Sequence, residues 1–204
     1  MKARRRVLLL PTGGANLASL VHALERAGAS CEVSGDRDAY RRAELLVLPG
    51  VGAAPEARRR LDAAELVPRL REERRPVLGV CLGMQLLFDA SEEGDVEGLG
   101  VVSGRVERLR AAAGRPVPNT GWSRVRPLRA SRLLDGGETE GWFYFVHSFA
   151  AAAQEDTVAV AEHGQPFAAV VERPPFFGTQ FHPERSAGAG ASVLARFLEL
   201  EPCA

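Results

Sequence analysis

Cys81 lies between two glycines in the stretch Gly79-Val80-Cys81-Leu82-Gly83, where an apolar run gives way to helical spacing. This pattern predicts a nucleophile elbow, a tight turn in which the flanking glycines let the backbone double back while the middle side chain projects. A sulfur in that place faces the positive end of the following helix, which favours the reactive thiolate. The pentapeptide alone fits a small buried side chain equally well, because free cysteines are commonly buried.

A histidine and a glutamate lie two residues apart in the stretch Phe181-His182-Pro183-Glu184. Pro183 biases His182 toward extended backbone, and residues two apart in an extended segment project to the same side. The imidazole and the carboxylate can therefore meet, which would supply a general base and the group that orients it. Taken by itself, a surface His-Pro turn with a solvated glutamate is the simpler interpretation. Together with Cys81, the segment would complete a nucleophile, base and orienter set.

The elements that must position these residues alternate between strand and helix in the first half of the chain. Apolar runs predict buried strands over Val7–Leu10, Leu45–Leu48 and Val77–Val80. Helical spacing follows each of them, from Leu17 to Gly28, through an alanine- and arginine-rich stretch to Arg75, and from Gly83 to Asp89. Strands that are apolar on both faces and alternate with helices predict an α/β fold, with a mostly parallel central sheet and helices on both faces.

The second half of the chain has shorter alternating segments, which predict antiparallel strands added to the same sheet. These segments are Val101–Leu109, Trp142–His147, Val158–Glu162 and Phe167–Val171. A last strand over Phe176–Phe181 and a closing helix over Gly190–Leu200 would follow. No low-complexity linker or internal repeat interrupts the pattern, so we expect a single domain over residues 1–204.

Composition excludes several classes of function. The 204 residues contain 26 basic and 26 acidic side chains and the pI is near 6.9, so no positive field would attract nucleic acid. The apolar runs are too short to cross a bilayer and no signal-like segment is present, so we expect a cytoplasmic protein. Cys31, Cys81 and Cys203 form neither a disulfide framework nor a zinc pattern, and we expect no metal or other cofactor.

Two arginine clusters stand out, at Arg58–Arg60 and Arg71–Arg75, on what reads as one long helix. Glutamate and alanine surround them, so a solvated helix face is a better interpretation than a patch that binds a partner.

The elbow, the His-x-Glu segment and a glycine-rich loop after the second strand together resemble the class I, triad-type glutamine amidotransferases. The resemblance covers nearly the whole chain, and within this group the sequence is most similar to the glutaminase subunits of imidazole glycerol phosphate synthase. The matching stretches are residues 48–52 (LPGVG), 79–88 (GVCLGMQLLF), 91–93 (SEE), 98–100 (GLG), 143–149 (FYFVHSF) and 177–186 (FGTQFHPERS).

The resemblance implies a flavodoxin-like fold and a catalytic triad of Cys81, His182 and Glu184. Cys81 would attack the side-chain carboxamide of L-glutamine, and His182 would protonate the departing ammonia and then activate water against the thioester. The backbone N–H groups of Val51 and Leu82 would hold the oxyanion. The glutamine pocket would be formed by Gly50, Gly52, Gln85, His147, Ser148 and Phe149. For His147 alone, a core histidine with satisfied hydrogen bonds is the competing interpretation.

The resemblance also implies a partner, a (β/α)8 cyclase or synthase subunit that forms a heterodimer with this chain and makes imidazole glycerol phosphate in histidine biosynthesis. The predicted sheet consumes the chain and leaves no room for a synthase domain, so the ammonia must pass to another polypeptide. The two glycines of the Pro49-Gly50-Val51-Gly52 loop would let a peptide plane turn, so that a partner could gate the oxyanion site. Arg185 and the Asn119–Ser123 segment are our candidates for the surface that senses it.

Two segments depart from the family pattern. Pro11-Thr12-Gly13-Gly14-Ala15-Asn16 stands where the family usually has Asp-Tyr-Gly-x-Gly-Asn, and Val117-Pro118-Asn119-Thr120-Gly121-Trp122-Ser123 where it has Val-Pro-His-Met-Gly-Trp-Asn. Neither touches the triad, but the second lies toward the partner in the family, so the partner's identity stays open. The alternatives are a glutaminase subunit of the anthranilate or pyridoxal-phosphate type, a catalytically silent binding subunit, and a stand-alone cysteine hydrolase of γ-glutamyl substrates.

Overall fold

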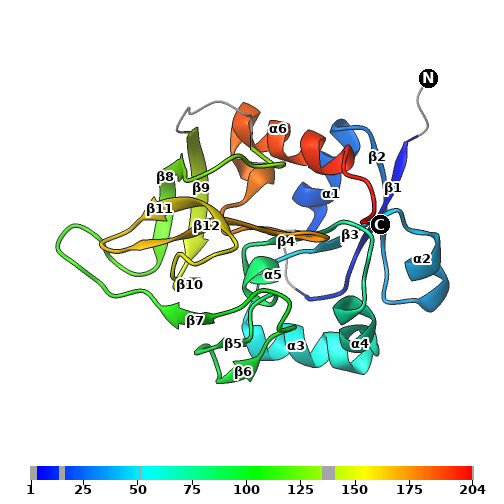
Figure 1. The fold of residues 1–204 in the computed structure, drawn as a ribbon, viewed down its shortest axis with the longest axis horizontal. Coiled ribbons are helices and arrows are strands. Elements are labelled where there is room, and N and C mark those ends of the chain that lie inside the picture. Colours follow the sequence, from blue (N-terminus) through cyan, green and yellow to red (C-terminus); the bar gives the residue numbers. More distant parts are fainter. Residues whose placement is uncertain (1–3, 14–16, 51, 135–140, 204) are drawn as a thin grey trace.

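A large mixed sheet forms the centre of the computed structural model, which describes residues 4–13, 17–50, 52–134 and 141–203. Within these residues nine strands pair side by side (Figure 1). Their order is β2 (Ala29–Val33), β1 (Arg5–Leu9), β3 (Leu45–Leu48), β4 (Val77–Val80), β13 (Phe176–Thr179), β12 (Pro166–Arg173), β11 (Thr157–Glu162), β8 (Asn119–Pro127) and β9 (Gly141–His147).

The sheet divides into a parallel and an antiparallel half. Strands β2, β1, β3, β4 and β13 pair in parallel, whereas β12, β11, β8 and β9 pair antiparallel. The predicted fold class is therefore confirmed. The last parallel strand, β13, lies beside β4, which brings the ends of the two segments predicted to carry chemistry next to each other.

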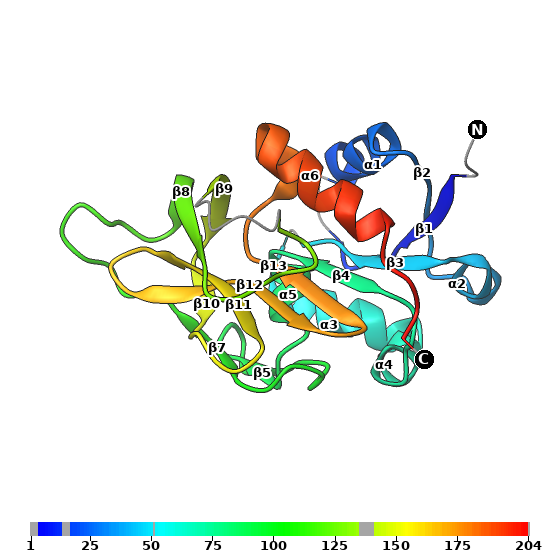
Figure 2. The ribbon, with the colours of Figure 1, turned by 45° about the horizontal axis from the view of Figure 1, so that its top comes forward.

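Helices cover both faces of the sheet (Figure 2). On one face lie α1 (Leu17–Arg26) and α6 (Ala187–Leu198), and on the other α2 (Arg37–Arg42), α3 (Ala54–Ala63), α4 (Leu66–Arg71) and α5 (Leu82–Gln85). Val7 and Leu9 of β1 contribute to one hydrophobic core, and Leu8 and Leu10 to the other. Burial on both faces also explains why β3 and β4 contain only apolar residues and glycine.

A second, smaller sheet differs from the prediction. Strands β10 (Phe149–Ala151), β7 (Arg105–Arg108), β5 (Ala90–Ser91) and β6 (Val96–Glu97) pair with one another rather than extending the central sheet. The strand expected over Val101–Leu109 is thus shorter and lies elsewhere. Figure 1 shows β5, β6 and β7 beside α3, on the side of the central sheet away from α6.

The predicted long helix to Arg75 is wrong, because the chain breaks it into α3 and α4. Glu65 adopts a left-handed conformation, with φ of 53°, and α4 starts again at Leu66. Pro68 explains the break, since in a continuous helix its ring would clash with the carbonyl of residue 64. In α4 it falls in the first turn, where its missing N–H costs no hydrogen bond.

The arginine clusters are mostly solvated, as expected, and several are paired. Arg58 and Arg60 form ion pairs along α3, with Asp62 at 3.0 Å and Glu56 at 2.6 Å. Arg58 and Arg75 are exceptions to a solvated face, because their side chains are only 18% and 20% exposed. Arg58 also donates to the Gly98 carbonyl, and Arg75 bridges Glu73, at 2.6 Å, and the Tyr40 carbonyl. This network ties α2 to the turn before β4.

The helix after the elbow is shorter than the predicted Gly83–Asp89. Helix α5 ends at Gln85, and the carbonyls of Leu86, Leu87 and Phe88 accept from the N–H groups of residues 99–102. Those carbonyls therefore accept hydrogen bonds from a neighbouring loop instead of from the next turn of a helix. Gly98 permits the close approach, because a Cβ there would lie 1.9 Å from the Phe88 oxygen.

The segment that carries His182 and Glu184 is wedged between β13 and α6. A short 3-10 turn, η1 (Pro183–Arg185), follows His182 directly, and α6 then packs back onto it. Gly190 of α6 makes this packing possible, since a Cβ at that position would lie 2.0 Å from the Pro183 carbonyl oxygen. The helix thus holds the predicted base and its orienter against the end of the sheet.

We predict opposite effects for the same substitution at two positions of α6. Gly190→Ala should lower the free energy of unfolding by about 1–3 kcal/mol or more, because the new methyl group overlaps the Pro183 backbone. Gly188→Ala should raise it by about 0.5–1 kcal/mol, because no atom lies within 4 Å of a Cβ there and alanine favours a helix. Urea titrations of both variants test this, and equal effects would contradict the proposed packing.

Candidate active site

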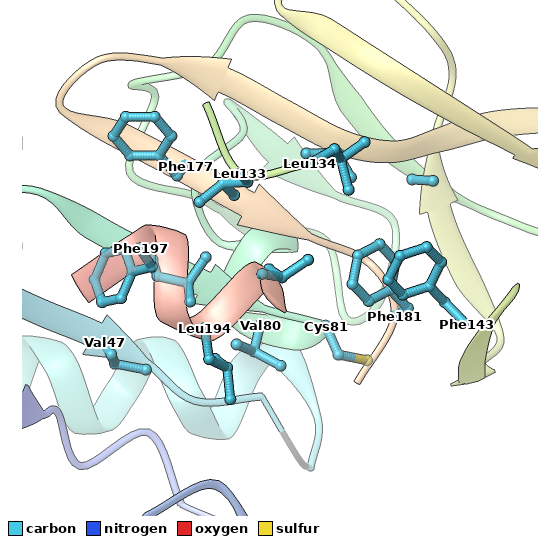
Figure 3. Close-up of a cluster of buried hydrophobic side chains, with 14 of the residues drawn as sticks. Val47, Val80, Cys81, Leu133, Leu134, Phe143, Phe177, Phe181, Leu194 and Phe197 are labelled. Atoms are coloured by element: carbon cyan, nitrogen blue, oxygen red, sulfur yellow. The ribbon is translucent and has the colours of Figure 1, made fainter. Parts of the chain in front are cut away.

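Cys81 occupies a sharp turn between β4 and α5. Its backbone has φ of 51° and ψ of −107°, its N–H donates to the Thr179 carbonyl at 2.7 Å, and its carbonyl accepts from the Gln85 N–H at 3.1 Å. A non-glycine residue in such a conformation costs on the order of 1–3 kcal/mol and persists only where neighbours impose it. The predicted elbow is present, and Figure 3 shows the Cys81 side chain beside the rings of Phe181 and Phe143.

His182 and Glu184 form a buried pair. Nδ1 of His182 lies 2.9 Å from Oε1 of Glu184, and both side chains are 3% exposed. Because a carboxylate only accepts, Nδ1 donates the proton and Nε2 is the nitrogen left for chemistry. Ser186 fixes the segment, since its hydroxyl donates to the His182 carbonyl at 2.6 Å. The predicted meeting of imidazole and carboxylate is confirmed in geometry.

The protonated form of His182 is strongly favoured. Burial lowers its pKa, but hydrogen bonding and charge interaction with Cys81 and Glu184 outweigh that effect and raise the pKa to about 10. Nε2 is buried, and it is the ring nitrogen that can interact with the Cys81 sulfur, because Nδ1 is bonded to Glu184. A buried nitrogen that can hold a proton beside a thiol is what proton transfer to a bound substrate requires.

A cavity of about 520 Å³ opens over the sulfur, within the range of small-molecule sites. Its walls include Cys81, Leu82 and His182, together with all six residues predicted for the pocket: Gly50, Gly52, Gln85, His147, Ser148 and Phe149. Glu184 lies behind His182. Val51, predicted to supply an oxyanion donor, is outside the described residues. Leu82 is the first residue of α5, so its N–H has no partner within the helix.

His147 reaches the cavity but both of its ring nitrogens are engaged. Nδ1 lies 2.9 Å from the Phe149 carbonyl oxygen, and Nε2 lies 3.1 Å from Nδ2 of Asn119. A carbonyl only accepts, so Nδ1 carries the proton and Nε2 accepts from Asn119. Burial lowers the pKa of His147 to about 4, so the ring is neutral. The side chain therefore braces the cavity wall.

Three residues near the sulfur were not predicted from the sequence as functional. Glu93 and Arg108 place opposite charges on the cavity wall. Gln180, fully buried, donates from Nε2 to the Cys81 sulfur at 3.5 Å. Glu93 and Gln180 lie inside stretches that matched the family, which was the available signal. Nothing in the sequence distinguishes Arg108 from the other arginines.

The segment Asn119–Ser123 is the first part of strand β8, and its side chains alternate between interior and surface. Asn119 is buried against His147, whereas Trp122 is 50% exposed. Only part of the segment therefore faces outward, as a strand requires. Arg185 is exposed, and its guanidinium lies 4.1 Å from the centre of the Tyr144 ring on β9.

The described residues contain neither a metal-binding cluster nor a membrane-spanning helix. These residues contain no cluster of three or more histidine, cysteine, aspartate or glutamate side chains suited to a metal ion. No helix in the described part of the chain is long and apolar enough to span a membrane.

Comparison with solved structures identifies the fold. The crystal structure of a putative GMP synthase component from Thermoplasma acidophilum superposes with a TM-score of 0.75, covers 98% of this chain and 94% of that one, and is 18% identical. PurLQS from Thermotoga maritima gives a TM-score of 0.71 at 19% identity, with 96% and 98% covered.

Comparison with known sequences identifies the family as well as the fold. The profile of the family described as glutamine amidotransferase class-I matches residues 8–200. The imidazole glycerol phosphate synthase subunit HisH of Xanthomonas oryzae pv. oryzae (strain MAFF 311018) is 50% identical over 194 residues, which cover 95% of this chain and 97% of that protein. The HisH subunit of Idiomarina loihiensis is 45% identical, with 97% and 99% covered. The chain belongs to the class-I glutamine amidotransferase family and, within it, to the HisH subunits of imidazole glycerol phosphate synthase.

Proposed function

We propose that this chain, as one amidotransferase domain over residues 1–204, hydrolyses L-glutamine to glutamate and ammonia and passes the ammonia to a synthase partner that makes imidazole glycerol phosphate. The observation that carries the proposal is a cavity of about 520 Å³ whose walls contain both the Cys81 elbow and His182, with Glu184 bonded to His182. A nucleophile, a proton carrier and its orienter are thereby assembled in one site.

The reaction follows from this arrangement in two halves. The Cys81 sulfur attacks the side-chain carboxamide carbon, the C–N bond breaks, and His182 gives its Nε2 proton to the departing nitrogen, which leaves as ammonia. Water then adds to the resulting thioester while His182 takes its proton, and the C–S bond breaks to release glutamate. Glu184 holds the ring by its Nδ1 proton throughout. The Leu82 N–H and, in our proposal, the Val51 N–H stabilise the oxygen that becomes negative.

The charges on the cavity wall suit an amino acid. Glu93 carries the negative charge that an α-ammonium needs, and its Oε2 is held by the Ala54 N–H at 2.9 Å, at the start of α3. Arg108 offers a guanidinium to the α-carboxylate, with its Cζ 5.6 Å from the centre of the Phe149 ring. These two charges favour free glutamine over an uncharged amide.

The outer surface of β8 and β9 supports a protein partner. Side chains of Trp122, Trp142 and Val146 are 50%, 57% and 38% exposed, and Tyr144 lies between them. We call this surface, with Arg185, the aromatic face. Large apolar groups on one side of a sheet mark interaction surfaces, and aromatic residues and arginine are enriched in them. We propose that the (β/α)8 synthase subunit docks here, so that the two chains form a heterodimer.

Our first prediction for this site is that Cys81 alone is the nucleophile. A diazo ketone analogue of glutamine should label Cys81 and leave Cys31 and Cys203 unmodified, as read by peptide mass mapping. Burial, with a smaller contribution from Glu25, raises the pKa of Cys31 to about 11, so that thiol is unreactive at neutral pH. Label on either of the other two cysteines would refute the assignment.

The second prediction separates the roles of His182 and Glu184. His182→Ala removes proton transfer and should leave only trace turnover, whereas Glu184→Gln should lower kcat by about ten- to a thousandfold. Because the carboxylate helps to raise the pKa of His182, the ring in Glu184→Gln should also lose its proton at lower pH. NMR titration of the ring measures this directly. Equal and mild losses in both variants would exclude both residues from the triad.

The third prediction concerns the partner. The isolated chain should hydrolyse glutamine slowly, and a candidate cyclase carrying its nucleotide ligand should raise the rate by about a hundred- to a thousandfold, the effect of one oxyanion donor. Gly52 is suited to such a change, since its φ is +118° and no atom crowds it.

Substitutions on the aromatic face provide the control for this partner effect. Trp142→Ser should weaken the stimulation by the partner, whereas Val33→Ser, at another exposed apolar site on the edge strand β2, should not. Full activity of the isolated chain, unchanged by the cyclase, would favour a stand-alone hydrolase.

A further inference from the structure

The uncharged side-chain amide of Gln180 contacts the Cys81 sulfur. The residue follows β13 and is completely buried. Nε2 lies 3.5 Å from the sulfur, and Oε1 accepts from Nε2 of Gln85 at 3.1 Å. The amide thus lies between the nucleophile and a second amide on the cavity wall.

The direction of this chain of hydrogen bonds is fixed by one backbone carbonyl. The Phe149 oxygen can only accept, and it receives Nε2 of Gln85 at 2.7 Å. The same Gln85 nitrogen donates its second proton to Oε1 of Gln180. The NH2 end of Gln180 must therefore face the sulfur, and it brings a donor rather than an acceptor.

The sulfur has a second neighbour with the opposite preference. The thiol of Cys81 donates to the Val146 carbonyl at 3.8 Å, an interaction that only the protonated sulfur can make. An N–H donor, in contrast, binds a thiolate more strongly than a thiol, because the acceptor then carries a full charge. The two neighbours therefore favour different protonation states of the same atom.

We propose that Gln180 donates its amide N–H to the Cys81 thiolate and stabilises it, and that Gln85 and the Phe149 carbonyl hold the amide in the donating orientation. The proposal rests on the function proposed above and adds a stabilising group to the nucleophile itself. The sulfur carries a negative charge before it attacks, loses that charge in the thioester, and regains it when the C–S bond breaks. A fixed N–H donor therefore stabilises the sulfur at the first and the last stage.

Other groups that face the sulfur must be separated from Gln180 in any test. His182 follows β13 and is backed by Glu184 in η1, and both are ionisable. His147 on β9 is neutral because burial lowers its pKa to about 4. Glu93 and Arg108 lie on the cavity wall. A variant of Gln180 leaves all of these charges in place.

The experiment is the pH dependence of Cys81 alkylation by iodoacetamide, followed by peptide mass mapping, in the wild type, Gln180→Leu and Gln180→Glu. The midpoint should move upward by about one to two pH units in Gln180→Leu, the effect of losing one hydrogen bond to a charged group. Gln180→Glu still accepts from Gln85 but places a carboxylate at the sulfur, so its shift should be at least as large. The matched control Gln154→Leu removes a partly buried amide from a different part of the fold and should leave the midpoint unchanged.

The unmodified chain provides an independent test should a variant fail to fold. In a nitrogen-15 spectrum, the side-chain amide of Gln180 should change with the same midpoint as the alkylation of Cys81. An amide signal that ignores this titration, or midpoints equal to that of the wild type in folded Gln180 variants, would overturn the proposal. Failure of the proposed function has a different signature: no glutaminase activity in the wild type with any partner, while the alkylation midpoint still depends on Gln180.

Discussion

The sulfur of Cys81 reaches the cavity because glycines let three backbone segments meet at the end of the sheet. A Cβ on Gly50 would lie 1.8 Å from the Val80 oxygen, and a Cβ on Gly83 would lie 1.8 Å from the Leu48 oxygen. The ends of β3 and β4 and the start of α5 are therefore packed backbone against backbone. This contact leaves Cys81 no room to relax from its positive φ, so the direction of its side chain is set by the main chain.

Much of the fold could be predicted because its central strands are buried on both faces. Strands β3 and β4 have the predicted bounds, Leu45–Leu48 and Val77–Val80. Strand β2 was missed because it lies at the edge of the sheet and carries polar residues that no periodicity separates from a loop. The break between α3 and α4 was missed although Pro68 signals it, since the alanine and arginine content on both sides favours a helix.

The site was predictable where its chemistry is local and not where it depends on tertiary contact. Cys81 lies in a turn that its glycine neighbours reveal, and His182 and Glu184 meet within three residues of sequence. Gln180 acquires its position only because β13 pairs beside β4, which aligns residues about a hundred positions apart. Asn119 was expected on a surface, and the alternation of β8 turns it inward to His147 instead.

Strand β9 contacts the candidate site with its backbone and forms part of the molecular surface with its side chains. The Val146 side chain belongs to the aromatic face, while the carbonyl of the same residue accepts from the Cys81 thiol. Tyr144 contacts Arg185 outside, and its carbonyl accepts from the N–H of His182 at 2.9 Å. The backbone of β9 thus contacts both Cys81 and His182, while its outward side chains form the aromatic face. The surface that we propose for the partner and the residues that we propose for the triad are therefore joined through one strand.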